Sequence, residues 1–575
     1  MENKEIARML SETADLMEVA GEDGFRIRSY RNAAAAVDVH PERVEDIVRN
    51  PERRATDIPG IGKGLAAVLA EITERGSFER RDEMLARYPA SALELLKIQG
   101  LGPKSIALLY EHHGVKTVDD LERICREHKL RELPRMGAKL EEKVLRSIEA
   151  YKKSAGRFLL SFGTNIAEEL RLQFSALPGI ERVEAAGSLR RGRDTIGDLD
   201  ILVTGPGAAE ALPFIVKHPK AQETLGLGEN KASVVYGLER LQVDVRALAA
   251  ESFGAALQYF TGSKEHNVAV RTNAVRQRLT LNEYGLFTIE GNQRVAGATE
   301  AEVYERLGYA WVPPELRENC GELDAAQNGT LPRLVDLPQI RGDLHMHTTE
   351  TDGKASLEEM AEAAAALGYE YIAITDHSKA LAMANGLDEA RVVAFAQKVR
   401  ELNQSGLPVR ILSGLECDIL RDGTLDIEES ALAELDLVVG SVHSFMNLEP
   451  QEMTDRLLRA LDSPSLRIVG HPTGRMLLHR EAYSFDFEAI ATKASARNIW
   501  MEINSSPERL DLNATMVRHA RRLGCRFTIS TDAHQPRHLN NMRYGVVTAR
   551  RGWLEASDVM NTLPFAELMT RLGRA

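Results

Sequence analysis

Seven short apolar runs beyond about residue 338 constrain the fold of this 575-residue chain more than any other feature. Each has the length and composition of a buried β-strand, and six of them end in side chains that bind metal ions. In a parallel β/α barrel, the carboxyl end of every strand reaches one face. The runs therefore predict a barrel with a multinuclear metal site. They close at Asp343–His347, Ala373–His377, Ser413–Glu416, Gly440–His443, Val469–His471, Met501–Asn504 and Ile529–His534.

Spacing within these strand ends suits chelation. His345 and His347 are separated by one residue, so both point to the same side of an extended strand, and Asp532 and His534 repeat the pattern. Mixed imidazole and carboxylate ligands suit Zn²⁺, Mn²⁺ or Fe, and neighbouring cations activate water for attack on phosphorus. Cys417 is a lone thiol and is expected to be a small buried hydrophobe. The pattern favours phosphoester hydrolysis over a metal-free barrel with scattered histidines.

Residues from about 338 to 575 resemble the polymerase and histidinol phosphatase (PHP) domain, a seven-stranded β/α barrel. The resemblance implies two or three Zn²⁺, Mn²⁺ or Fe ions, with Glu416 as a bridging ligand. Asp352 lies in an Asp-Gly pair that is also typical of an ordinary turn. Asp343 and Asp376 are expected to orient neighbouring histidines, although direct coordination by Asp376 stays open. The implied ligands are His345, His347, Asp352, His377, Glu416, His443, His471, Asp532 and His534.

A second group of carboxylates lies far upstream. Asp198 and Asp200 share one face of a predicted strand, and Asp244 lies on another strand that alternates apolar and polar residues. A glycine turn, Gly187-Ser188, and a run of arginines precede Asp198. Carboxylates of this kind hold Mg²⁺ or Mn²⁺ for phosphoryl transfer, while backbone amides and arginines hold a triphosphate. The alternative is that Asp198 and Asp200 are solvated residues of an edge strand.

These carboxylates resemble the palm of nucleotidyltransferases, and residues 257–271 with 281–286 resemble the thumb of family X DNA polymerases. The resemblance implies that Asp198, Asp200 and Asp244 bind the catalytic metals. It also assigns substrate contacts. Gly187, Ser188 and Arg191 would hold the phosphates, Tyr259, Phe260 and Gly262 the sugar, Asn267 the base, and Arg271 the template strand. From composition alone, Tyr259 and Phe260 would be an ordinary aromatic core pair.

The first 150 residues carry a repeated glycine turn followed by a helix. Such helix-hairpin-helix turns bring backbone N–H groups to a DNA phosphate without reading sequence. A plain turn between two helices is the alternative, and a weaker third copy runs from Leu133 to Lys139 with Arg135 in place of the first glycine. The residues expected to contact DNA are Gly60, Gly62 and Gly64 in the first copy and Gly100, Gly102 and Lys104 in the second.

One departure from family X concerns the same region. In vertebrate members, a lysine in the helix after the first hairpin forms a Schiff base with a 5′-sugar phosphate. Val68 stands at the matching position, and two assisting lysines correspond to Gly64 and Arg26. Lys63 lies one residue early, and so is rotated by about 100° on the helix. We expect DNA binding without efficient lyase activity.

Composition sets the cellular context. The net charge of −13 argues against DNA binding only if charge is spread evenly, so affinity must come from local patches such as Arg190–Arg193. The four cysteines have no paired spacing, and no apolar stretch is long enough to span a membrane. We expect a cytoplasmic monomer whose partners are gapped or nicked double-stranded DNA and deoxynucleoside triphosphates.

The complete prediction is a multidomain polymerase that fills short gaps in base excision repair, with a 3′-5′ exonuclease or 3′-end-processing phosphoesterase attached. Two alternatives remain: a PHP barrel that is only a structural platform, and a non-catalytic DNA-end scaffold. The expected domains are α-helical helix-hairpin-helix regions at 1–95 and 96–152, an α+β palm at 153–240, the end of the palm with the thumb at 241–317, a linker at 318–337 and the barrel at 338–575.

Overall fold

The computed structural model describes residues 1–573 apart from 2, 39, 41, 90, 99, 135 and 155. The chain divides into two compact units, residues 1–155 and residues 156–575. Within the part of the chain that the structure describes, no helix has both the length and the apolar character needed to cross a membrane.

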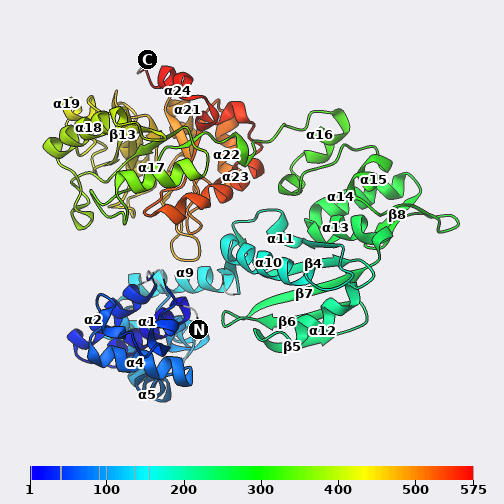
Figure 1. Cartoon of the computed structure of the whole chain (residues 1–575), viewed down its shortest axis with the longest axis horizontal. Coiled ribbons are helices and arrows are strands. Elements are labelled where there is room, and N and C mark those ends of the chain that lie inside the picture. The colour runs from blue at the N-terminus through cyan, green and yellow to red at the C-terminus, as the bar shows by residue number, and fades with distance from the viewer. Residues whose placement is uncertain are drawn as a thin grey trace. The chain divides into compact units, whose positions relative to one another are not determined.

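The first unit is helical (Figure 1). Gly60 and Gly100 adopt φ values of +87° and +97°, which only glycine reaches without strain. Each turn leads into a helix, α4 or α7, capped by Gly62 or Gly102. Both predicted hairpins are therefore present, whereas Arg135 of the third copy lies outside the described residues. The helices are α1 (Asn3–Val19), α2 (Gly24–Asp38), α3 (Val44–Arg49), α4 (Lys63–Arg75), α5 (Glu79–Arg87), α6 (Ala92–Leu95), α7 (Pro103–His113), α8 (Val118–Arg126) and α9 (Ala138–Ser154).

The second unit begins with a five-stranded sheet in the order β2-β4-β7-β6-β5. The central strands β4 and β7 are parallel, and the register places Asp200 opposite Asp244. Residues of α10 (Leu160–Ser175) and α12 (Ala211–Val216) share the sheet's apolar core, which leaves the carboxylates on the other side of their strands. The strands are β2 (Arg182–Ala185), β4 (Asp198–Thr204), β5 (Ala221–Leu227), β6 (Lys231–Tyr236) and β7 (Leu241–Leu248).

A smaller lobe follows the sheet. Its core joins α13 (Phe253–Thr261), α14 (Lys264–Arg276), α15 (Glu300–Arg306) and the antiparallel strands β8 (Leu279–Asn282), β9 (Gly285–Thr288) and β10 (Arg294–Ala296). The expected linker is partly wrong, because α16 (Glu322–Asn328) lies inside it and packs Leu323 and Ala326 into this core. A helix of two turns shows little periodicity in sequence.

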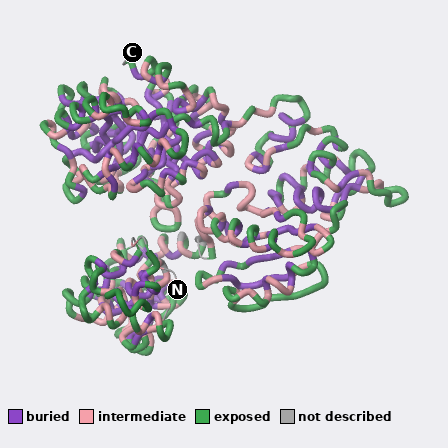
Figure 2. The backbone as a smooth tube through the Cα atoms, in the orientation of Figure 1, coloured by how far each residue is buried: buried purple, intermediate pink, exposed green. Residues whose placement is uncertain are grey.

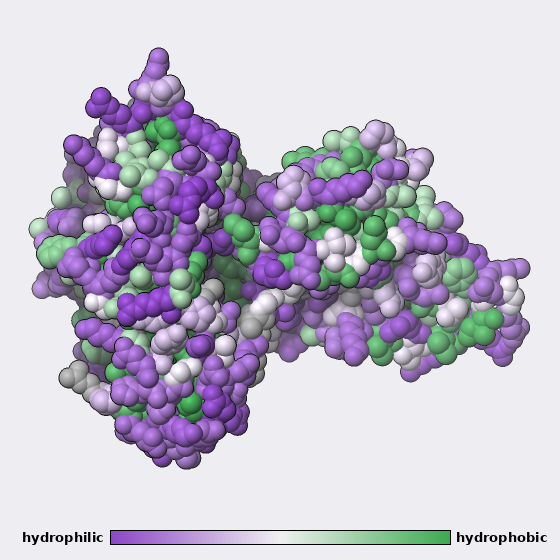
Figure 3. All heavy atoms as spheres, turned by 90° about the horizontal axis from the view of Figure 1, so that it is seen from below, coloured by the Kyte–Doolittle hydropathy of each residue, from purple (hydrophilic) through white to green (hydrophobic). Residues whose placement is uncertain are grey.

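The predicted seven-stranded barrel is present, with all strands parallel and in chain order from β11 to β17. The barrel closes where His347 N–H donates to Ala533 O at 2.8 Å, beyond the ends of β11 and β17. Buried residues follow these strands in Figure 2, whereas the face drawn in Figure 3 mixes hydrophilic residues with smaller apolar areas. The strands are β11 (Gly342–Asp343), β12 (Tyr371–Ile374), β13 (Arg410–Asp418), β14 (Leu437–Ser441), β15 (Ile468–Val469), β16 (Trp500–Asn504) and β17 (Phe527–Ser530).

Candidate active sites

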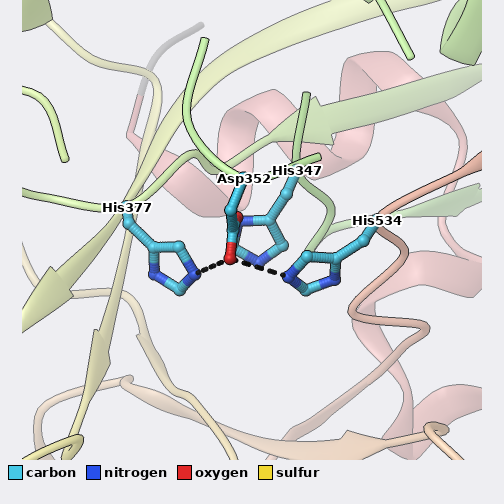
Figure 4. Close-up of side chains that lie close together, drawn as sticks. All are labelled: His347, Asp352, His377 and His534. Carbon is cyan, nitrogen blue, oxygen red and sulfur yellow. Dashed lines mark ion pairs between the residues drawn. The ribbon is translucent and has the colours of Figure 1, made fainter. Parts of the chain in front are cut away.

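The clearest candidate metal site lies at the carboxyl ends of the barrel strands (Figure 4). Asp352 Oδ2 lies 3.6 Å from Nε2 of His377 and 3.6 Å from Nε2 of His534, and Asp352 Oδ1 lies 4.0 Å from His347 Nδ1. Burial alone would raise the pKa of Asp352, but its contacts with the two outer histidines lower it. The residue that could have been an ordinary turn aspartate therefore lies in the cluster.

Two further groups adjoin this cluster. His345, His347 and Asp532 form one, and His377, Glu416 and His443 form the other. Glu416 lies among five histidines, at distances of 2.9 Å from His377 and His471, 3.3 Å from His443, 3.4 Å from His345 and 3.6 Å from His347. This central position suits the bridging role expected for Glu416. All nine residues predicted as ligands come together at one face.

The donor atoms fit metal coordination. His345 Nε2, His347 Nδ1 and His471 Nδ1 are buried and have no hydrogen-bond partner in the described structure. Buried polar atoms are normally satisfied, so these nitrogens need a ligand. Burial and the neighbouring His534 and His377 lower the pKa of His347 to about 3, which keeps its lone pair free. The set of imidazoles and carboxylates suits Zn²⁺, Mn²⁺ or Fe.

Backbone strain accompanies two of the predicted ligands. His471 has a φ of +25° and Asp532 a φ of +54°, in a region that non-glycine residues rarely adopt. Such strain clusters at functional sites and persists only where the surroundings enforce it. The backbone N–H of His471 donates to Glu502 Oε2 at 2.6 Å, and that of Asp532 donates to His345 O at 3.0 Å. These bonds hold the strained ligands in place.

The residues that orient the histidines differ from those expected. Glu502 Oε1 lies 2.7 Å from His345 Nδ1, and Asp418 Oδ1 lies 3.2 Å from His443 Nδ1. In the part of the chain that the structure describes, neither Asp343 nor Asp376 forms a hydrogen bond or ion pair with a histidine ring. Asp343 accepts hydrogen bonds from Thr531 and from the backbone of His345, and Asp376 accepts them from Thr348 and Thr351. The expectation was wrong for Asp376, which bonds to threonines of an adjacent loop, whereas Asp343 bonds both to Thr531 and to the backbone of His345.

Arg509 is a cation that sequence analysis missed at this site. Its Nε lies 3.7 Å from Asp532 Oδ2, and its Nη1 is buried without a hydrogen-bond partner in the described structure. A guanidinium beside a metal ligand can bind a phosphate oxygen. No spacing pattern marks Arg509, because it lies in the loop after β16.

The palm brings Asp198, Asp200 and Asp244 to one side of β4 and β7. Burial, with the nearby charges of Asp198 and Asp244, raises the pKa of Asp200 to about 7. Burial would also raise the pKa of Asp244, but hydrogen bonds from Lys231 and others lower it, and Lys231 Nζ lies 2.5 Å from Asp244 Oδ2. Among the described residues, only the barrel groups have all ligand atoms within 4.8 Å of one another, so the palm carboxylates are more widely spaced.

Near these carboxylates, Gly187 lies close to Asp200, and the neighbouring arginines already have partners. Gly187 approaches Asp200 so closely that an added Cβ would lie 3.0 Å from Oδ2. Arg191 contacts Thr261 O and lies 3.1 Å from Glu318, and Arg190 forms two hydrogen bonds to Glu300 at 2.8 and 2.7 Å. The arginine run expected to form a local positive patch is therefore largely paired with acids.

In the smaller lobe, the side chain of Asn267 is already bonded. It accepts from Gln258 at 2.8 Å and donates to Tyr259 O at 2.7 Å. Tyr259 and Phe260 form an edge-on aromatic pair with ring centroids 5.1 Å apart. Arg271 is exposed on α14, so its side chain is open to a DNA strand. Their assigned roles in substrate binding stay predictions.

The palm and the barrel touch directly through Asp194. Arg475 and Arg551, both from the barrel, lie 2.9 Å and 3.0 Å from its two carboxylate oxygens. Arg475 also donates to Arg509 O at 2.9 Å, so one side chain joins the palm to the loop that carries Arg509. An apolar cluster that includes Leu160 and Tyr544 lies at the same boundary.

These features define an enzyme of nucleic acid metabolism with a nucleotidyltransferase palm, a thumb and a metal-binding phosphoesterase barrel. Four family models match: a helix-hairpin-helix domain over residues 1–78, a SAM-like helix-hairpin-helix tandem over 92–150, the DNA polymerase beta thumb over 256–318 and the PHP domain over 343–506.

The DNA polymerase/3′-5′ exonuclease PolX of Bacillus subtilis (strain 168) is 36% identical over 575 residues, covering 100% of both chains. DNA polymerase lambda of Arabidopsis thaliana is 25% identical over 347 residues, covering 55% of this chain and 62% of that protein. The rat polymerase lambda, from Rattus norvegicus, is also 25% identical, over 55% of this chain and 56% of its own length. The chain belongs to the PolX family of DNA polymerases with a C-terminal PHP domain, and is a DNA polymerase/3′-5′ exonuclease.

Proposed function

We propose that this polymerase fills short gaps in duplex DNA during base excision repair. The helix-hairpin-helix turns support this role, because backbone N–H groups at a helix start bind phosphate without reading sequence. Asp198, Asp200 and Asp244 would hold Mg²⁺ or Mn²⁺, which stabilise charge on the transferring phosphoryl group. Lys231 occupies one oxygen of Asp244 at 2.5 Å and would have to move when metal binds. Gapped DNA and deoxynucleoside triphosphates are the proposed substrates.

The barrel would remove nucleotides or blocking groups from a 3′ end. The observation that carries this proposal is the convergence of nine metal-type side chains on one face, eight of them in three close groups and His471 beside Glu416, with buried imidazole nitrogens left without a partner in the described structure. Two or three Zn²⁺, Mn²⁺ or Fe ions would supply an activated water and stabilise the leaving oxygen. Arg509 would bind a nonbridging oxygen of the scissile phosphate, because it supplies positive charge beside Asp532.

A barrel that serves only as a structural platform is the second candidate. The contacts around Asp194 favour it in part, since they make the barrel a support for the palm. A purely structural barrel would not need ligands with unsatisfied buried nitrogens, however. We therefore favour an active barrel that also supports the palm.

One assay separates these proposals. A 5′-labelled primer on gapped DNA is incubated with Mg²⁺ or Mn²⁺, with and without nucleotides, so that extension and shortening are read on the same gel. The His443→Ala variant should lose shortening and bound metal while keeping extension. Shortening that survives in this variant would exclude the barrel as the nuclease. Absence of extension by the unaltered protein would exclude gap filling.

A further inference from the structure

Phe445 is an unusual surface residue near the barrel's metal site. It follows β14 and stands two residues after His443, so the two Cα atoms are at most about 7 Å apart. The residue is 53% exposed, and its φ of +51° lies in the left-handed region that a bulky side chain avoids. Single exposed apolar residues are common on proteins, but exposed aromatic residues held in strained backbone are not. The combination indicates a function for the ring.

A fully buried arginine holds this strained backbone in place. Arg456 of α20 (Pro450–Ala460) is 2% exposed and donates to Ser444 O at 3.0 Å. The same guanidinium donates to Leu420 O at 2.8 Å and to Ile419 O, in the loop after β13. The Arg456 side chain therefore links the loop after β13, the strand of Glu416, to the loop after β14, which carries His443. The backbone beneath Phe445 is fixed although its ring faces solvent.

The ring also has a cation beside it. The guanidinium carbon of Arg421 lies 5.7 Å from the centroid of the Phe445 ring, and Arg421 Nη2 donates to Glu452 at 3.2 Å. Arg421 lies in the loop after β13, next to Leu420. An exposed aromatic face with an adjacent arginine is the arrangement by which proteins bind single-stranded nucleic acids, through stacking on a base and attraction to its backbone.

We propose that Phe445 is a stacking platform for the base of a nucleotide at the DNA 3′ end, with Arg421 beside it. The proposal rests on the proposed 3′-5′ exonuclease function of the barrel. Because five of the nine predicted metal ligands are buried, the terminal nucleotide has to leave its duplex partner to bring its phosphodiester to them, at a cost of a few kcal/mol. Stacking on a fixed ring offsets that cost. It also accepts any base, since every base has a flat face.

The first test compares two labelled oligonucleotides, one ending in an ordinary thymidine and one ending in a tetrahydrofuran abasic residue. Phe445→Gly removes the ring while tolerating positive φ, and Phe445→Trp keeps an aromatic face. Loss of base stacking changes binding by about 5- to 150-fold. We expect KM for removal of the ordinary terminus to rise by about tenfold or more in Phe445→Gly and to change little in Phe445→Trp.

The abasic terminus should be removed equally well by the unaltered protein and Phe445→Gly, since it has no base to stack. Leu367→Ala is the matched control, because Leu367 is 44% exposed and follows α17 (Leu357–Ala366), which leads to the opposite ends of the strands. Equal KM values for the ordinary terminus in Phe445→Gly and the unaltered protein would overturn the stacking platform and leave the exonuclease intact. Equal losses on both substrates would also overturn it. Failure of the unaltered protein on both would instead refute the exonuclease.

A second readout does not depend on hydrolysis. An oligonucleotide with 2-aminopurine at its 3′ terminus is added to the full-length protein in excess chelator, and fluorescence reports base stacking. Quenching should be strong with the unaltered protein, Phe445→Trp and Leu367→Ala, and clearly weaker with Phe445→Gly. Identical quenching by Phe445→Gly and the unaltered protein would show that the base does not stack on this ring.

Discussion

Replacing Glu502 by glutamine tests how the barrel fixes its metal ligands. Glu502 is fully buried and accepts from His345 Nδ1 at 2.7 Å, from the backbone N–H of His471 at 2.6 Å and from Asn504 Nδ2 at 3.2 Å. A carboxylate offers two acceptor oxygens, whereas glutamine offers one oxygen and an NH₂ donor. In Glu502→Gln, the NH₂ group must therefore face either the imidazole N–H of His345 or the backbone N–H of His471.

The expected magnitude follows from that mismatch. Losing a buried hydrogen bond to a charged group costs about 1.5–3 kcal/mol. Changes to residues that orient metal-binding histidines lower metal affinity by about 10- to 100-fold, which corresponds to about 1.4–2.7 kcal/mol. The two estimates overlap. We expect Glu502→Gln to weaken metal binding by about 10- to 100-fold.

Metal affinity is measured by competition with a chromophoric chelator, and 3′-end shortening is measured across metal concentrations. Shortening should recover at high metal concentration, since every direct ligand is retained, and primer extension should be unchanged. Glu488→Gln on α21 (Phe487–Ala496) is the control, because its side chain is 68% exposed. Metal affinity in Glu502→Gln equal to that of Glu488→Gln would refute the orienting role.

Three further outcomes are expected. Asp198→Ala or Asp244→Ala should lower primer extension by orders of magnitude and leave shortening intact, and a gel in which both activities vanish would contradict two separate sites. In metal-free protein, the pKa of Asp200 is raised to about 7 from an unfolded value of 3.8. Between these values the unfolded chain ionises Asp200 while the folded protein keeps it protonated, so the free energy of unfolding falls as pH rises. Thermal melts should show Asp200→Asn stabilised by about 2 °C or more at pH 8 but not at pH 3, and destabilisation at pH 8 would refute this. Borohydride should trap no strong adduct on an incised abasic site, whereas an adduct that disappears in Lys63→Ala would show a lyase.

The strand-end pattern was sufficient to predict the barrel and its metal face. Side chains at the ends of parallel strands must meet, so convergence of His345, His377 and His443 needs no knowledge of loop structure. The resemblance to the PHP domain then supplied the remaining predicted ligands, and the structure brings all of them together. The helix α16 was missed for the opposite reason. Two turns between Pro314 and Pro332 give too few residues for a helical period to emerge.

Partners across the barrel could not be predicted in the same way. Asp343 and Asp376 were expected to orient the histidines next to them in sequence. A carboxylate at the end of a strand, however, bonds to side chains that follow the neighbouring strand. The closure of the barrel places Thr531, after β17, beside Asp343. His345 instead pairs with Glu502 of β16, which is 157 positions away along the chain. Sequence shows which side chains reach the face, whereas strand order and barrel curvature decide which of them touch.

Glu502 also gives a role to the one run that carries no predicted ligand. The run Met501–Asn504 ends at the same face as the others, yet its acid bonds to two ligands of other strands, His345 and His471. A carboxylate has one acceptor oxygen for each of these two bonds, so Glu502 supports the site only while His345 and His471 keep their positions. Convergence at a barrel face therefore does not by itself separate the predicted metal ligands from acids, such as Glu502, that bond to them.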